Sequence, residues 1–228
     1  RQLQNRTTIK PLQPKMWPAD SIDDINEQID RHSSIMMKAP WSGSGRGLRR
    51  VEWQLSEQDI FWAEKILREQ GCVIVEPFHQ VAADFAFEYY IGNASRWPTK
   101  LAPYTFAPDV HFIGYSLFKT QNGVYRSNIL WSDERIEEFL TEQYSINIGG
   151  LASQIGSWLQ ETLSGRYQGP VGVDLFIDNE RMPYVCEMNL RHTMGLVAHE
   201  RLRNNPSLEG TECEIIPPKT TQLINNQQ

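Results

Sequence analysis

Two apolar segments near the end of the chain are separated by a short polar stretch. Residues 172–177 and 183–189 are mostly apolar, and residues 178–181 (Asp-Asn-Glu-Arg) are typical of a turn. This spacing predicts an antiparallel hairpin, in which the two strands must lie side by side. Because side chains alternate along a strand, residues two positions apart face the same side of that hairpin. No other pattern in the sequence constrains the fold as strongly.

The rest of the sequence alternates between helical and strand patterns. Helices are predicted after a cap at Asp20 or Ser21 and over residues 56–70, 133–144, 147–163 and 196–203, with Phe61 and Trp158 on apolar faces. Further strands are predicted over residues 35–37, 72–75, 84–91, 110–118 and 124–131. The segment 72–75 is a continuous apolar run, as expected of a strand buried on both faces. Strands and helices together predict an α+β fold.

Composition excludes several classes of protein. The net charge of −6 and the pI near 5.4 argue against a nucleic-acid-binding protein, because such binding depends on clustered Lys and Arg. The sequence has no apolar stretch as long as a membrane span and no apolar leader. Its three cysteines lack the spacing of a zinc site or a disulfide framework, so a cytoplasmic location is expected. The chain begins with Arg1 and not Met, which suggests a trimmed fragment without its N-terminal part.

The predicted hairpin carries two acidic residues that could share one site. Glu187 and Asn189 face the same side of their strand, and Arg191 continues this direction if the strand persists. Hairpin pairing can bring Asp174 opposite Glu187. Carboxylate and amide oxygens suit Mg²⁺ held against nucleotide phosphates far better than they suit zinc. The alternative is that both acids lie on an exposed sheet face without any ligand.

A second candidate site follows the predicted strand at residues 35–37. Lys38 ends this strand, and a loop rich in glycine and serine comes soon after it, with Ser42, Gly43, Ser44, Gly45 and Gly47 as candidate residues. Glycines let backbone N–H groups approach a phosphate closely, and the lysine can supply positive charge. The loop matches neither a Walker A nor a Rossmann pattern. An ordinary turn rich in glycine and serine is the alternative.

A third candidate site is the end of the apolar strand at residues 72–75. Glu76, Pro77 and Phe78 follow this strand and could form an edge for an adenine ring. The Pro77 carbonyl could accept a hydrogen bond, and because proline has no N–H, the Phe78 amide would have to be the donor. Asp84 could accept from the ribose hydroxyls. A core strand followed by a turn is the alternative.

In this order and spacing, the three features resemble the ATP-grasp superfamily over residues 15–200. The most specific match is the hairpin with Asp174 and the run from Glu187 through Asn189 to Arg191. The resemblance implies an α+β fold of two lobes, with the nucleotide bound between antiparallel sheets. Residues 21–80 would form the first lobe, with the glycine loop and hinge, and residues 81–205 the second lobe, with the metal site. Residues 1–20 would be a lead-in segment and residues 206–228 a polar tail.

The resemblance also implies a role for the candidate residues. Asp174, Glu187 and Asn189 would hold one or two Mg²⁺ ions on the ATP phosphates, and Mn²⁺ could substitute. Lys38 and the glycine loop would close over the phosphates. Arg191 would stabilise the acyl-phosphate transition state or the tetrahedral species that follows it. The implied reaction is ATP-dependent activation of a small-molecule carboxylate, which an amine or thiol nucleophile then attacks.

Several alternatives and secondary candidates accompany this interpretation. A small-molecule kinase on the same fold and a non-catalytic nucleotide-binding module of a larger assembly are the two other hypotheses. A missing N-terminal domain that completes the acceptor site is expected, and a homodimer is a further expectation. Secondary candidates for the cleft are Lys10, Lys15, Lys119, Arg126, His192, Trp41, Trp97 and Trp131. Solvated surface positions or core positions are the alternative for these residues.

Overall fold

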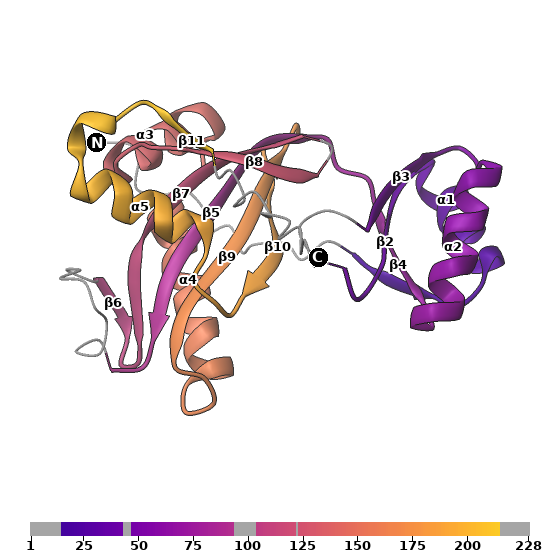
Figure 1. The fold of residues 1–228 in the computed structure, drawn as a ribbon, viewed down its shortest axis with the longest axis horizontal. Helices are drawn as coiled ribbons and strands as arrows, with labels where there is room; N and C mark the ends of the chain where they lie inside the picture. Colours follow the sequence, from indigo (N-terminus) through magenta and orange to yellow (C-terminus); the bar gives the residue numbers. More distant parts are fainter. Residues whose placement is uncertain (1–14, 43–46, 94–103, 122, 215–228) are drawn as a thin grey trace, which may run out of the picture.

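The computed structural model of the chain describes residues 15–42, 47–93, 104–121 and 123–214. These residues form two lobes, and each lobe is built on its own sheet (Figure 1). All neighbouring strands in both sheets are antiparallel. The α+β class and the arrangement of two antiparallel sheets are therefore confirmed. Among the described residues, no helix has both the length and the apolar character that a membrane crossing requires.

The smaller lobe has a sheet with the strand order β1-β4-β2-β3. Its elements are β1 (Trp17–Ala19), α1 (Ile22–His32), β2 (Ser34–Lys38), β3 (Leu48–Glu52), α2 (Glu57–Gln70) and β4 (Val73–Pro77). Capping boxes at Ser21 and Ser56 begin the two helices, and residues with positive φ, Ser33 and Gly71, end them. Both helices cover the same face of the sheet, which leaves the other face directed at the larger lobe (Figure 1).

The larger lobe has a sheet with the order β10-β9-β5-β7-β8-β11, and β6 pairs with β7 beside this path. Its strands are β5 (Val81–Ile91), β6 (Tyr104–Ala107), β7 (Val110–Gln121), β8 (Val124–Ile129), β9 (Gly169–Asp178), β10 (Pro183–Asn189) and β11 (Glu212–Glu214). Its helices are α3 (Asp133–Tyr144), α4 (Ile148–Leu163) and α5 (Met194–Asn204), followed by the 3-10 turn η2 (Pro206–Leu208). The helices α3 and α4 pack on one face, where the main core lies.

Strand β5 divides the larger lobe into a core face and an open face. Phe85, Phe87 and Tyr89 are fully buried in the core against α3 and α4. Because side chains alternate, Asp84 and Glu88 point to the opposite face of the sheet. This second face is covered in part by α5, and the remainder borders the space toward the smaller lobe. Strand β5 therefore contributes side chains both to the core and to the wall of a cavity.

Several local predictions from the sequence differ from the structure. Strand β1 lies within the expected lead-in and β11 within the expected polar tail, because each completes the edge of a sheet by pairing with β4 or β8. The strands β3 and β6 were not predicted. Phe61 is 72% exposed and Trp158 is 40% exposed, although both were placed on apolar helix faces. Ile74 is only half-buried, because helices cover one face of its sheet and not both.

Candidate functional site

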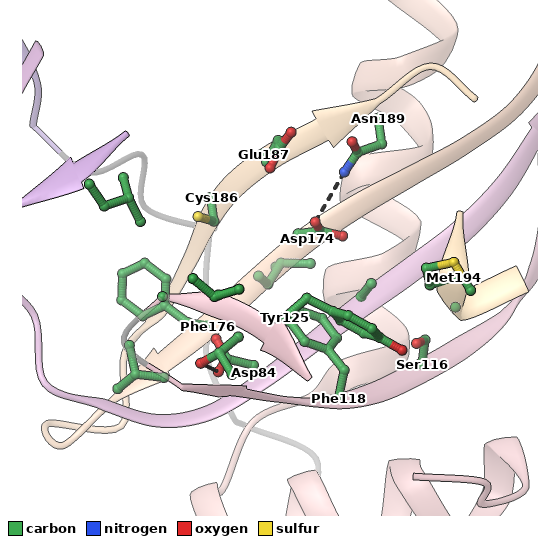
Figure 2. A pocket seen from close by; sticks show the side chains of 18 of the residues that line it. Asp84, Ser116, Phe118, Tyr125, Asp174, Phe176, Cys186, Glu187, Asn189 and Met194 are labelled. Carbon is green, nitrogen blue, oxygen red and sulfur yellow. Dashed lines mark hydrogen bonds between the residues drawn. The ribbon is translucent and has the colours of Figure 1, made fainter. Parts of the chain in front are cut away.

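A cavity of about 1070 Å³ lies between the two sheets. The smaller lobe lines it with residues of β2, β3 and β4, and the larger lobe with residues of β5, β7, β8, β9, β10 and the start of α5. Figure 2 shows Asp174 and Phe176 on β9 beside Cys186, Glu187 and Asn189 on β10. The hairpin that carries the predicted metal ligands therefore forms one wall of the cavity.

The hairpin register brings the predicted metal-site residues together. Glu187 pairs directly with Asp174 across the two strands, and a bulge between Val185 and Glu187 sets this register. The Asn189 side-chain amide donates to Asp174 Oδ2 at 3.0 Å (Figure 2). Arg191 in turn donates from Nη2 to Asn189 Oδ1 at 2.9 Å. The four residues thus form one connected group, as the sequence predicted.

The electrostatics of this group fit a bound cation. Burial raises the pKa of Asp174 to about 7, and the nearby Glu187 carboxylate adds to the shift, while Arg191 opposes it. Two carboxylates and an amide oxygen suit Mg²⁺ that takes its remaining ligands from phosphate and water. No group of three or more His, Cys, Asp or Glu side chains able to hold a metal ion exists in the described parts of the chain. A magnesium ion bound to Asp174 and Glu187 would therefore need further ligands that are not His, Cys, Asp or Glu side chains of the described residues.

The predicted phosphate lysine faces the cavity from the smaller lobe. Lys38 Nζ lies 2.6 Å from Glu76 Oε2, and both residues line the cavity. The Ser42 hydroxyl donates to the Ala39 carbonyl at 2.8 Å, and the Ala39 amide donates to the Gly47 carbonyl at 2.9 Å. These contacts close the base of the glycine loop. Gly43, Ser44 and Gly45, which were predicted to cover the phosphates, lie outside the described residues.

The predicted adenine edge differs from the structure in its donor. The Phe78 amide donates to the Ser34 carbonyl at 2.9 Å and so extends the pairing between β4 and β2. The prediction that this amide is free for an adenine ring is therefore wrong in this structure. Backbone groups of successive residues in an extended strand point to opposite edges. The Pro77 carbonyl, at the end of β4, consequently points away from β2. The next amide after Phe78 is that of His79, which has no hydrogen-bond partner among the described residues, so this pair of groups can offer one acceptor and one donor.

Aromatic side chains and Asp84 surround this edge. The rings of Phe176 and Tyr184 stack with centroids 5.1 Å apart, and the His79 ring lies 4.3 Å from that of Tyr184. Asp84 lines the same cavity and accepts a hydrogen bond from Thr120 Oγ1 at 2.7 Å. Burial raises the pKa of Asp84. Sequence reasoning found Asp84 but missed His79 and Phe176 as parts of the wall.

Glu88 is a further acidic residue of the cavity that the sequence interpretation missed. Its side chain is 1% exposed, and Thr193 Oγ1 donates to its Oε2 at 2.8 Å. Burial raises the pKa of Glu88 to about 8, and the neighbouring Asp174 contributes to this rise. The signal was present in the sequence, because Asp84 and Glu88 are an even number of positions apart on one predicted strand.

Most of the secondary candidates lie away from the cavity. Lys119 pairs with Glu212 near the edge of the sheet, and neither Lys119 nor Arg126 lines the cavity. His192 lies 3.6 Å from Glu200. Lys15 is exposed, Trp41 is 82% exposed, and Trp131 packs against the main core. Lys10 and Trp97 lie outside the described residues. Lys119 and Arg126 are thus surface residues and Trp131 packs on the core, which is the alternative interpretation given for them above.

No protein-family model matches the sequence, and no curated protein matches it. Solved structures do match. The N5-carboxyaminoimidazole synthetase of Staphylococcus aureus complexed with ADP has a TM-score of 0.54 and 16% identity, over 80% of this chain and 41% of that chain. The carboxyaminoimidazole ribonucleotide synthase of Aspergillus clavatus complexed with ATP has a TM-score of 0.55 and 12% identity, over 81% of this chain and 42% of that chain.

A third match extends the likeness to another enzyme. The biotin carboxylase of Campylobacter jejuni in a beta-gamma-ATP complex has a TM-score of 0.54 and 15% identity, over 83% of this chain and 40% of that chain. At these identities the likeness concerns the fold. The chain spans about two fifths of the length of the proteins that it matches.

Proposed function

We propose that this chain, which has the ATP-grasp fold of the enzymes that it matches, binds ATP and Mg²⁺ in the cavity between its two sheets. We propose further that it is the ATP-binding part of a ligase. Such a ligase activates a substrate carboxylate as an acyl phosphate, which an amine or a thiol then attacks. A phosphoryl transfer of this kind depends on positioning and charge neutralisation and needs no nucleophilic side chain.

One observation carries the proposal. Asp174 and Glu187 face each other across the hairpin, and Lys38 lines the same cavity from the other sheet. A nucleoside triphosphate needs carboxylates that can hold its Mg²⁺ and a positively charged side chain that can contact its phosphates. The cavity supplies both, from two lobes and from positions far apart in the sequence.

Each residue of the cavity then has a proposed task. Asp174, Glu187 and Asn189 would hold Mg²⁺, which neutralises phosphate charge when it is bound. Lys38 would contact the phosphate oxygens. The Pro77 carbonyl and the His79 amide would bind the adenine edge, and Asp84 would accept from the ribose. Arg191 is exposed next to this group and hydrogen-bonded to Asn189, so its guanidinium can stabilise negative charge that develops on the acceptor side.

Isothermal titration of ATP, with and without Mg²⁺, tests the binding part of the proposal. We expect ATP affinity to depend on Mg²⁺ in the wild type and to lose this dependence in the double variant Asp174→Asn/Glu187→Gln. Both substitutions preserve side-chain size and remove charge, so a folded variant isolates the carboxylates. Equal, magnesium-independent binding by both proteins would overturn the site.

Trapping with hydroxylamine separates the ligase from the kinase alternative. An acyl phosphate formed from a carboxylate substrate reacts with hydroxylamine to give a hydroxamate, whereas a phosphorylated alcohol does not. We expect hydroxamate to form in the presence of ATP, Mg²⁺ and a mixture of small carboxylic acids. A stable phosphate ester as the product would exclude the ligase and favour the kinase.

A further inference from the structure

The segment that joins the two lobes runs along the cavity. Residues 78–80 connect β4 in the smaller lobe to β5 in the larger lobe (Figure 1), and Phe78 and His79 line the cavity. Phe78 is bound to the smaller lobe. Its amide donates to the Ser34 carbonyl at 2.9 Å, and the Arg50 guanidinium carbon lies 3.8 Å from the centre of its ring. Phe78 is therefore fixed to β2 and β3.

The next two residues are bound to the larger lobe. The His79 ring nitrogen Nδ1 lies 3.3 Å from Asp178 Oδ2, and the Asn179 amide donates to the Gln80 carbonyl at 3.1 Å. Asp178 ends β9, and Asn179 lies in the turn that follows it. The attachment of the chain thus changes from one lobe to the other immediately before His79.

Asp178 is a fixed acceptor for this imidazole. Its side chain is 7% exposed, and its Oδ1 accepts from the backbone amides of Glu180 and Met182, each at 3.0 Å. Its other oxygen, Oδ2, faces the His79 ring. Because a carboxylate only accepts hydrogen bonds, Nδ1 must carry a ring proton to bind it. The turn after β9 therefore holds an acceptor in place for one particular nitrogen of the ring.

Aromatic contacts restrict the His79 ring further. Its centroid lies 4.3 Å from that of Tyr184 and 5.7 Å from that of Phe176, and these two rings stack on each other. The His79 side chain is 20% exposed. A rotation of this side chain would break the contact with Asp178 and both ring contacts. Because side-chain rotamers are coupled to the backbone dihedrals, a fixed ring also restricts the direction of the amide of the same residue.

The His79 amide lacks the support that a strand amide has. Its nitrogen has no recorded hydrogen-bond partner in the part of the chain that the structure describes, whereas the direction of an amide within a sheet is set by its ladder. The contacts of the His79 side chain, together with the neighbouring bond at Gln80, are therefore what hold this amide at the cavity wall.

We propose that His79, held by Asp178, is a positioning residue for the nucleotide base. The imidazole keeps the His79 amide aligned with the Pro77 carbonyl, so that both groups can meet an adenine edge at the junction of the lobes. This inference rests on the proposed function and adds a side-chain interaction that sets the preference for adenine. The side chain acts through its own backbone and not through contact with the base.

Two substitutions of similar shape separate the hydrogen bond from the ring packing. Asparagine carries an N–H donor as far from the backbone as Nδ1 of histidine, whereas leucine carries a methyl group there. We expect His79→Leu to bind adenosine about fivefold more weakly than the wild type, the loss expected for one hydrogen bond. His79→Asn should stay within about twofold of the wild type, because the donor to Asp178 is kept. Titration calorimetry measures these affinities.

Inosine provides a readout that a loss of stability alone would not change. Its exocyclic oxygen accepts and the adjacent ring nitrogen donates, the reverse of adenosine, so inosine mismatches the proposed backbone pair. The preference for adenosine over inosine should shrink in His79→Leu and persist in His79→Asn. His199→Leu is the matched control, since His199 also lies 3.3 Å from an acid, Asp133, is similarly buried and does not line the cavity. Its adenosine binding should match that of the wild type.

A measurement on the wild type keeps the test decisive if His79→Leu does not fold. In mildly alkaline solution, ¹⁵N NMR of the imidazole should show the proton of the His79 ring on Nδ1, before and after adenosine is added. A ring protonated on Nε2 alone would overturn the proposal, since Nδ1 could then donate no hydrogen bond to Asp178.

The variants give the remaining decisive outcomes. Equal losses of adenosine affinity in His79→Leu and His79→Asn, or an unchanged preference over inosine in folded His79→Leu, would also overturn the positioning role. Adenosine binding that His79→Leu leaves at the wild-type level defeats this role alone. Wild-type protein that binds neither ATP nor adenosine defeats the proposed function itself.

Discussion

Lys38 Nζ and Glu76 Oε2 lie 2.6 Å apart and join the neighbouring strands β2 and β4 through an ion pair. Glu76 is opposite Met36 in the sheet, so Lys38, two positions further along β2, reaches it diagonally on the same face. The Glu76 side chain is 9% exposed and the Lys38 side chain 25%. Because the pair is shielded from solvent, the ammonium group has a fixed position at the cavity wall. A phosphate would meet a lysine that is already oriented.

The first prediction concerns the charge of Lys38. Lys38→Met should weaken ATP binding about tenfold or more, because a charged hydrogen bond contributes about 1.5–3 kcal/mol. Adenosine binding should change much less, since adenosine has no phosphate. Titration calorimetry with ATP, ADP and adenosine measures the three affinities. A loss of equal size for adenosine and ATP would contradict a phosphate contact.

Lys119→Met is the matched control for this variant. Lys119 is also a strand lysine paired with an acid, Glu212, but it does not line the cavity. The substitution removes the same charge and leaves the same side-chain length. ATP affinity should therefore stay within about twofold of the wild type, as is usual for surface pairs of small energetic effect.

The second prediction follows from the raised pKa of Asp174. Burial lifts this pKa from 3.8 to about 7, so between these values the folded protein holds a proton that the unfolded chain has released. The free energy of unfolding must then fall as pH rises through this window, by up to about 1.4 kcal/mol per pH unit for one group. Glu88, with its pKa raised to about 8, acts in the same direction.

Urea unfolding at a series of pH values tests this dependence. In Asp174→Asn the amide cannot ionise, so the free energy of unfolding should decline less steeply between about pH 4 and pH 7 than in the wild type. The gap between the two curves should widen toward neutral pH, with the variant the more stable. Parallel curves would mean that Asp174 does not titrate with a raised pKa.

Periodicity and capping residues sufficed for most of the fold. Ser21, one of the two predicted caps, begins the first helix, and Ser56 and Ser132 cap helices that begin within a residue of the predicted bounds, because an N-cap side chain is a local interaction. The short strands β1 and β11 could not be found in this way. Each has three residues, and each exists because a distant strand offers an unpaired edge. Such pairing depends on tertiary context that no local pattern contains.

The same distinction between local and tertiary information applies to the candidate site. The sequence could predict that one hairpin carries Asp174 and Glu187 close together, but their direct pairing depends on the bulge between Val185 and Glu187, because regular alternation from the turn would put Cys186 opposite Asp174. Alternation placed Glu88 on the same face of its strand as Asp84, but the burial of Glu88 depends on where α5 and the other lobe lie, which no local pattern contains. The Phe78 amide was misjudged for a related reason. Its partner, the Ser34 carbonyl, is on a strand that is not adjacent in sequence.

The third prediction concerns backbone amides at the adenine edge. The Phe78 amide is hydrogen-bonded to Ser34, so its hydrogen exchange should be slow before nucleotide is added. The His79 amide has no hydrogen-bond partner among the described residues and should exchange faster. If it donates to the adenine ring, ATP or adenosine should slow its exchange and leave that of Phe78 unchanged. Exchange measured by NMR on ¹⁵N-labelled protein reports both amides.

The outcome for these two amides distinguishes two binding geometries. Slower exchange at His79 alone fits the Pro77 carbonyl and the His79 amide as the pair that binds adenine. If nucleotide instead speeds exchange at Phe78, the bond to Ser34 has opened and Phe78 is the donor after all. No change at either amide would place the adenine ring elsewhere in the cavity.

The last prediction uses Cys186 as a reporter of the cavity. Cys186 lies in the β10 bulge next to Glu187, lines the cavity and is exposed, whereas Cys213 is 4% exposed and Cys72 is half-buried. Iodoacetamide can therefore reach Cys186. Desolvation in the cavity wall raises the pKa of the Cys186 thiol to about 11, so the reaction should be slow at pH 7 and quicken about tenfold per pH unit between pH 7 and pH 9. ATP with Mg²⁺ should protect Cys186, because the phosphates and the metal would occupy the space beside Glu187.

Mass spectrometry of the modified peptides measures this protection, and Cys186→Ser identifies the signal. Modification at the same rate with and without nucleotide would show that ATP does not bind against β10, even if it binds elsewhere on the protein.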